Sequence, residues 1–199
     1  MHDAATIEAR RDRTLWRLPG LRVAGRQRAL RFLEQAGLAS LFAHRQLNLP
    51  CLWVAVCGRR DPVFPHHSHH DPEVALAWNL KDALPAARRV FYGKLLRGRP
   101  TFVAWELFPA VWRLFALPGD HRAALAAGRL SPAAARILDA LHRRRPQETF
   151  ALKLAADLAR PSQRRVFDAA MAELQATLQV CMAEVRYDPF TYVWDLVTA

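Results

Sequence analysis

The stretch from residue 131 to residue 197, SPAAARILDALHRRRPQETFALKLAADLARPSQRRVFDAAMAELQATLQVCMAEVRYDPFTYVWDLV, decides the fold of this chain. Ser131 followed by Pro132 is a typical helix start, because serine accepts a bond from an unpaired backbone N–H and proline has no N–H to leave unpaired. Apolar residues then recur at helical spacing until RRRP at 143–146 ends the helix. The same signals predict a second helix over 148–158 and a third over 163–178.

Two alternating runs, 180–187 and 191–197, follow the third helix and predict a β-hairpin. Three helices followed by a two-stranded wing is the order of the winged helix-turn-helix. The third helix would then be the recognition helix, and its first exposed turn carries Gln163, Arg164 and Arg165, where side chains reach a major groove. Because the same module also serves protein contacts, the pattern alone leaves both functions open.

The apolar side chains of these two later helices are expected to face the core. On the second helix they are Phe150, Leu152, Leu154 and Leu158, and on the third they are Val166, Phe167, Ala170, Met171 and Leu174.

The composition favours a globular protein with a polyanionic partner. Hydrophobic residues make up 52% of 199 residues, which is enough for a proper core, so global disorder is excluded. The formal net charge is +11, and nearly all of the positive charge is arginine, whose guanidinium group binds phosphates and guanine edges in a bidentate manner. Such a charge predicts binding that weakens as salt rises, but RNA and acidic proteins remain alternative partners.

The cysteines and the lengths of the apolar runs indicate in which cellular compartment the protein is expected. Cys51, Cys57 and Cys181 have no CxxC spacing and each lies in an apolar run, so we expect reduced, buried thiols. No segment resembles a signal peptide, and no apolar run approaches the roughly 18 residues of a membrane span. These features predict a cytoplasmic protein without a membrane partner.

The front half repeats the theme of helices followed by a hairpin. Its pattern predicts helices over 25–37, 50–57, 73–84, 106–117 and 120–130, a short strand over 38–43, and strands over 88–96 and 101–105. The tip between the last two strands carries Arg97 and Arg99. We therefore expect a mainly α chain with small β-hairpins (α+β), built as tandem winged-helix modules. The expected divisions are an arm or short helix over 1–20, a degenerate module over 21–118 and a second module over 119–199.

The run His66-His67-Ser68-His69-His70 is the obvious candidate metal site. Neutral imidazoles bind zinc and nickel. Ligands so close in sequence rarely surround one ion tetrahedrally, and no other histidine or cysteine has matching spacing. We therefore predict a solvated loop, no metal and no cofactor.

Residues 78–99 carry candidate nucleic-acid contacts. An aromatic residue and basic residues on a hairpin can stack on a base and hold phosphates. The alternative is that Trp78 and Tyr92 belong to the core and that Asp82 pairs with a nearby arginine. Besides Gln163, Arg164 and Arg165, the candidate DNA-binding residues are Lys81, Arg89, Tyr92, Lys94, Arg97 and Arg99.

Several short segments of the chain together resemble one known superfamily. They are Leu52-Trp53, Trp78 with Lys81-Asp82, 92–97 (YGKLLR), 102–107, 130–138, 165–168 (RVFD), 173–175 (ELQ) and Tyr192-Val193-Trp194. With these segments, which are spread over most of 25–197, the chain resembles the AlkZ (YcaQ-type) superfamily of winged-helix DNA glycosylases. It is most similar to the short AlkZ-related proteins.

The resemblance implies tandem winged helices and excision of alkylated bases, including crosslinked ones. The catalytic signature of the superfamily is Gln-apolar-Asp or Gln-apolar-Gln on a strand shortly after a helix that ends in glycine. Counted from Gly37, that position falls on Ser40-Leu41-Phe42, which cannot position a water. Gln46-Leu47-Asn48 mimics the signature six residues later, but asparagine cannot act as a carboxylate base. The weak catalytic candidates are Gln46, Asn48 and Asp82.

These observations favour a DNA-binding protein of AlkZ-related type, linked to DNA repair, whose catalytic signature is lost. Its expected partner is double-stranded DNA, including alkylated DNA, without a small-molecule cofactor. One alternative is an active monofunctional glycosylase that receives a flipped base near Trp78 and Tyr92. A second alternative is a winged-helix transcriptional regulator.

Overall fold

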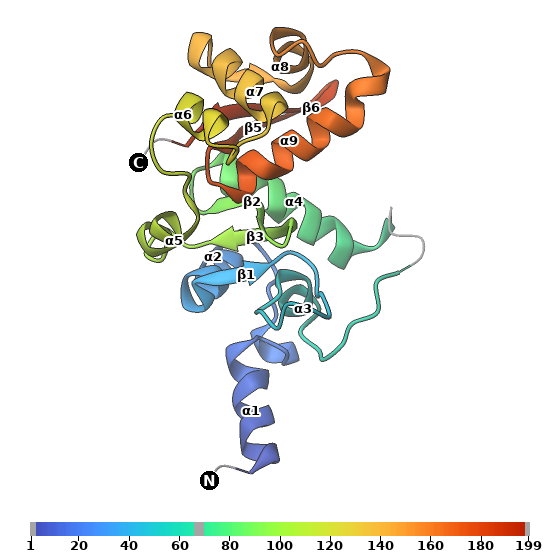
Figure 1. Ribbon diagram of the computed structural model, residues 1–199. Coiled ribbons are helices and arrows are strands. Elements are labelled where there is room, and N and C mark those ends of the chain that lie inside the picture. The colour runs from blue at the N-terminus through green and yellow to red at the C-terminus, as the bar shows by residue number, and fades with distance from the viewer. Residues whose placement is uncertain (1–2, 66–69, 198–199) are drawn as a thin grey trace. The chain divides into compact units, whose positions relative to one another are not determined.

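A computed structural model describes residues 3–65 and 70–197, and its helices and small antiparallel sheets confirm the α+β class (Figure 1). The chain divides into two compact units, each of which joins separate stretches of sequence. The first contains 1–91 and 100–108, and the second contains 92–99 and 109–199.

The first unit is mainly helical. Its elements are α1 (Ala4–Thr14), the short 3-10 helix η1 (Pro19–Leu21), α2 (Arg26–Ala36), β1 (Leu38–Ser40), α3 (Leu52–Cys57), α4 (Pro72–Ala86) and most of β3 (Arg99–Val103). Phe32, Leu52, Leu84 and Phe102 are among its fully buried side chains. Ala39 of β1 lies opposite Phe102 of β3 in an antiparallel register.

The second unit includes most of β2 (Phe91–Leu96), a strand from the front half of the chain. Its remaining elements are most of α5 (Phe108–Phe115), α6 (His121–Ala126), α7 (Pro132–Arg143), β4 (Gln147–Glu148), α8 (Thr149–Ala155), the 3-10 helix η3 (Pro161–Gln163), α9 (Arg164–Ala176), β5 (Val180–Tyr187) and β6 (Phe190–Leu196). Ile137, Leu141, Leu152 and Leu174 are central to its apolar core. This core holds α7, α8 and α9 together.

The same order of elements occurs twice along the chain. The order is helix, strand, helix, helix, strand, strand. It is formed first by α2, β1, α3, α4, β2 and β3, and again by α7, β4, α8, α9, β5 and β6. The strand orders also agree, being β1-β3-β2 in one sheet and β4-β6-β5 in the other. This repetition is consistent with tandem winged helices, although the two halves share no clear sequence repeat.

The predicted start of α7 is confirmed. The Ser131 hydroxyl accepts a hydrogen bond from the Ala134 N–H at 3.2 Å, and Pro132 occupies the first turn. The predicted C-terminal hairpin is also confirmed, with Val180 of β5 opposite Leu196 of β6. The arm expected over 1–20 contains a regular helix, α1, which is capped by the Asp3 carboxylate.

Several local expectations are wrong. Phe150 and Leu154 are 65% and 57% exposed because α8 has only seven residues and turns only Leu152 fully into the core. Val166, at the start of α9, is 45% exposed. The strand expected over 38–43 ends at Ser40.

No helix in the described part of the chain is long and apolar enough to cross a membrane.

Candidate nucleic-acid interface

The start of α9 presents two arginines to solvent. Phe167, Met171 and Leu174 fix the inner face of this helix in the core, so Arg164 and Arg165 lie on its outer side and are exposed. The Arg164 Nε lies 3.9 Å from Asp168 Oδ2, which is a weak, exposed ion pair. Arg165 has no carboxylate partner among residues 3–65 and 70–197. Gln163, directly before the helix, is half-buried.

The basic hairpin ends in a two-residue turn made by Arg97 and Gly98. Both have positive φ, at 50° and 68°, as a type I′ hairpin turn requires. Glycine adopts such an angle without steric cost, whereas the arginine is slightly strained. Lys94, Arg97 and Arg99 are all exposed on this hairpin.

The strand that carries Lys94 is fastened to α9. The Lys94 backbone N–H donates to the Gln175 side-chain oxygen at 3.2 Å, and the Gln175 amide donates in turn to the Met171 carbonyl at 3.0 Å. Gln175 is buried, its bond to the Met171 carbonyl is buried as well, and its bond from Lys94 is partly buried. Lys94, Arg97 and Arg99 therefore belong to the same compact unit as Arg164 and Arg165.

Helix geometry gives the distance along α9 between Arg164 and the residue that binds the Lys94 backbone. Gln175 lies eleven residues after Arg164, and a rise of 1.5 Å per residue puts about 16 Å between them along the axis of α9. Phosphates on one strand of B-DNA are spaced about 3.4 Å along the helix axis. The point at which the Lys94 backbone is bonded to α9 thus lies about five phosphate spacings from Arg164 along the helix axis.

The remaining candidates for DNA contact have different environments. Arg89 is exposed and Tyr92 is half-buried. Lys81 is only 5% exposed, its ammonium lies 2.7 Å from the Asp82 carboxylate, and it stands 4.9 Å from the Trp78 ring centre. A buried, paired ammonium does not favour a direct phosphate contact. The alternative that Asp82 pairs with a basic side chain is met here by Lys81.

The position where the superfamily signature would fall offers no catalytic group. Ser40 is 2% exposed, and its hydroxyl donates to the Pro50 carbonyl at 3.3 Å. Leu41 is fully buried. Phe42 packs in a cluster of aromatic rings, with centroid distances of 5.4 Å to Trp78, 5.3 Å to Phe64 and 6.3 Å to Trp53. This position is occupied by packing side chains.

The loop with Gln46 and Asn48 lies at the surface of the first unit. Both side chains are exposed, and the Asn48 oxygen accepts a long hydrogen bond, 3.4 Å, from Arg11 of α1. Asn48 lines an open pocket of about 530 Å³ together with Arg11, Arg45 and apolar residues. The structure therefore brings Asn48 next to basic side chains, but Asp82 is not among the residues that line this pocket.

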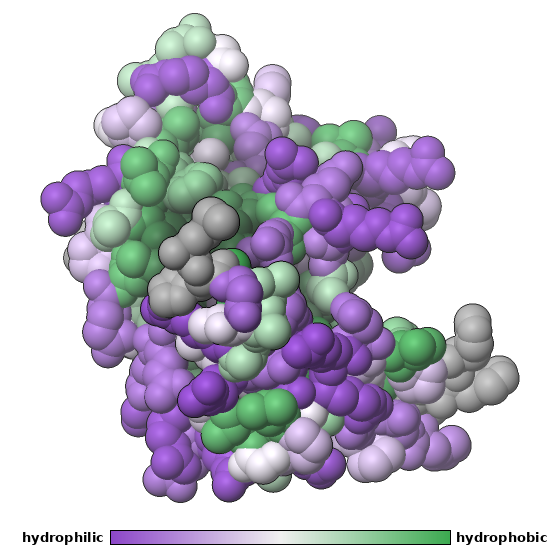
Figure 2. Space-filling view, turned by 90° about the horizontal axis from the view of Figure 1, so that it is seen from below, coloured by the Kyte–Doolittle hydropathy of each residue, from purple (hydrophilic) through white to green (hydrophobic). Residues whose placement is uncertain are grey.

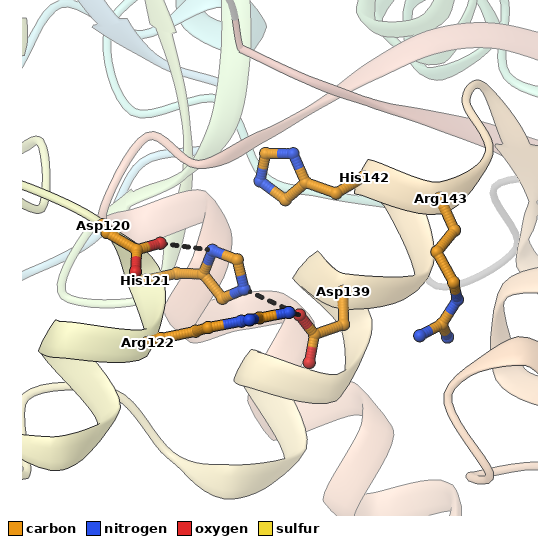
Figure 3. Close-up of a pocket in the computed structure, with 6 residues that line it drawn as sticks. All are labelled: Asp120, His121, Arg122, Asp139, His142 and Arg143. Carbon is orange, nitrogen blue, oxygen red and sulfur yellow. Dashed lines mark hydrogen bonds and ion pairs between the residues drawn. The ribbon is translucent and has the colours of Figure 1, made fainter.

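A polar cluster between α6 and α7 was not predicted from the sequence (Figure 3). The His121 Nε2 lies 2.9 Å from Asp139 Oδ1, and its Nδ1 lies 3.2 Å from Asp120 Oδ1. The ring of His142 stacks on that of His121, with centroids 5.0 Å apart. These residues line a pocket of about 460 Å³ with Arg122 and Arg143. The only signal in the sequence was the local triplet Asp120-His121-Arg122, because Asp139 is too distant to be paired by spacing.

The His121 cluster perturbs the ionisation of Asp139. The hydrogen bond from His121 holds the pKa of the Asp139 carboxyl below its usual value, with a smaller effect from nearby arginines. Both nitrogens of His121 face carboxylate oxygens, so an imidazolium can donate to both. The cluster links α6 to α7 electrostatically.

The described residues contain no group of three or more side chains arranged to hold a metal ion. Of the predicted solvated loop His66-His67-Ser68-His69-His70, all but His70 lies outside the described residues. Cys51 and Cys57 are buried free thiols, as expected, whereas Cys181 is only half-buried.

The repeated order of elements places the chain in a class of α+β proteins consistent with tandem winged helices. The chain matches the family described as AlkZ related over residues 23–191, and it belongs to that family. This confirms the resemblance found in the sequence and relates the fold to that of DNA-repair glycosylases. Neither a curated protein nor a solved structure matches the chain.

Proposed function

We propose that the protein binds double-stranded DNA, including alkylated DNA, in a repair context and does not excise bases. The observation that carries the proposal is the presence of two exposed basic segments in one compact unit. Lys94, Arg97 and Arg99 lie on the hairpin, and Arg164 and Arg165 begin α9. Both segments carry exposed cationic side chains on one folded unit, which supports a phosphate contact by each of them.

The proposed loss of catalysis rests on the residues around the signature position. A glycosylase must stabilise positive charge on the deoxyribose and deliver a water molecule. The buried Ser40, Leu41 and the ring of Phe42 offer neither a carboxylate nor an amide for these tasks. Asn48 is exposed and has an amide, which can orient a water molecule but cannot accept its proton.

The test is one titration and one single-turnover incubation with an N7-alkylguanine duplex and its undamaged counterpart. When Arg164 and Arg165 are changed together to alanine, we expect the log–log salt slope of binding to become shallower. The change should be about 0.9 for each phosphate that the variant no longer neutralises. The matched control, Arg164→Lys with Arg165→Lys, should keep most of the slope. An unchanged slope in the alanine variant would show that the start of α9 does not contact DNA.

The incubation decides between binding and excision. After alkaline cleavage to reveal abasic sites, we expect no product above the level of DNA alone at any protein concentration. Base release that Gln46→Ala abolishes would instead establish the glycosylase alternative. Strong preference for one undamaged sequence would favour a transcriptional regulator.

A further inference from the structure

Helix α1 lies outside the part of the chain that matches the family, which begins at residue 23. Within the first unit it extends away from α2, α3 and the strands (Figure 1). None of its side chains is buried, so the hydrophobic effect does not explain its position. The contacts that hold it are polar.

The acidic side chains of α1 face the rest of its unit. Glu8 Oε2 lies 2.7 Å from Arg17 Nη2, and Asp12 Oδ1 accepts from Arg60 Nε at 2.8 Å. Arg17 also lies 2.9 Å from Asp12. Hydrogen bonds from these arginines hold the pKa values of the Glu8 and Asp12 carboxyls below their usual range. The two carboxylates of the helix are thus paired with arginines on the side that faces the rest of the unit.

The outer side of α1 carries positive charge. At about 100° per residue, Arg10 lies about 180° and Arg13 about 120° around the helix from the midpoint between Glu8 and Asp12, so both point away from the paired side. Both arginines are exposed and have no carboxylate partner in the described part of the chain. The side chains next to them, Ala9 and Thr14, are small. Asp3 caps the helix N-terminus, about two turns before Arg10.

This outer face fits a phosphate backbone better than a lipid surface. Two unpaired guanidinium groups one turn apart among small side chains allow a close approach to phosphates. A helix that lies on a membrane needs a broad apolar side, whereas the outer face of α1 offers only Ile7, which is 49% exposed. Figure 2, which views the molecule from below the view of Figure 1, shows hydrophilic residues over much of the surface on that side.

We propose that α1 is an additional DNA-backbone contact, added outside the family fold, in which Arg10 and Arg13 bind phosphates. The inference rests on the proposed DNA binding, because it adds a phosphate contact to that activity. The ion pairs of Glu8 and Asp12 set the orientation of the helix within its own unit, so that its two outer arginines point away from Arg17 and Arg60.

The experiment measures fluorescence anisotropy of a labelled duplex between 50 and 200 mM KCl with the full chain. Arg10→Ala with Arg13→Ala should reduce the log–log slope by about 1.8, so that the ratio of affinities at the two salt concentrations shrinks about twelvefold. Arg10→Lys with Arg13→Lys should retain most of the slope, because it keeps both charges. Far-UV circular dichroism checks that each variant is folded.

A second control removes the same net charge elsewhere. Arg122→Ala with Arg129→Ala takes two exposed arginines from the segment around α6. An equal loss of slope in this variant and in the α1 variant would mean a general charge effect and overturn the proposal. So would an effect of the α1 variant that is confined to binding of phosphatidylglycerol vesicles.

The failure of this inference is distinguishable from the failure of the proposed function. If the Arg10 and Arg13 variant keeps the parent slope while the Arg164 and Arg165 variant loses it, DNA binding stands and the role of α1 is refuted. If the parent shows no DNA binding at 50 mM KCl, both proposals are refuted.

Discussion

Gln175 is the side chain whose replacement tests the attachment of the hairpin to α9. Gln175→Met keeps a similar volume but removes the acceptor for the Lys94 N–H at 3.2 Å and the donor to the Met171 carbonyl at 3.0 Å. A backbone N–H left without a partner costs about 1–3 kcal/mol. Because the bond from Lys94 is partly buried, water can replace the missing side-chain acceptor only in part. We expect the free energy of unfolding to fall by roughly 2 kcal/mol.

Urea unfolding measures this loss, and amide hydrogen exchange locates it. With a slope of about 1–3 kcal/mol per molar urea, the midpoint should fall by about 1 M, and the Lys94 amide should exchange faster. Gln179→Met is the matched control, because the Gln179 side chain bonds only locally, to the Thr177 carbonyl at 3.2 Å. Equal stability of the two variants, or unchanged protection of the Lys94 amide, would refute the reasoning.

Two further predictions concern ionisable groups. Because the hydrogen bond from His121 lowers the pKa of Asp139, its stabilising effect is present above the ordinary aspartate value of 3.8 and is lost as pH falls through the lowered value. Asp139→Asn should therefore lower the urea midpoint at about pH 6 and do so progressively less as the pH falls below 3.8, and a constant difference would contradict this. Burial, with a smaller effect of a neighbouring carboxylate, raises the pKa of Cys57 to about 12, and burial also raises that of Cys51. A thiol reagent at pH 8 should therefore react with the half-buried Cys181 first, and fast labelling that survives Cys181→Ser would show this to be wrong.

Local signals in the sequence predicted the second half of the chain well. Ser131 and Pro132 define a helix start through their own hydrogen-bonding chemistry, so α7 could be located without knowledge of its neighbours. The hairpin of β5 and β6 follows from alternation over seven or eight residues. The two-residue strand β4 was missed because its existence depends on pairing with β6, a partner about 45 residues away.

The environments of the site residues depended on tertiary structure. The sequence identified the exposed Arg164 and Arg165, but it could not show that Lys81 is buried against Asp82. It also gave no sign that Gln175 binds the Lys94 backbone, because that bond joins residues 81 positions apart. Side-chain burial and long-range hydrogen bonds are set by how elements pack, which residue spacing along one element does not reveal.

The second compact unit is discontinuous in sequence, and this limits how the protein can be divided. Residues 92–99 belong to the second unit, but in the sequence they lie between 1–91 and 100–108, which form the first unit. No single cut of the chain yields both units intact, since a fragment that begins at residue 109 lacks the strand that binds Gln175. A cut between the two repeats leaves each repeat whole along the sequence but separates β2 from α9, so the isolated C-terminal fragment loses a strand of its own compact unit.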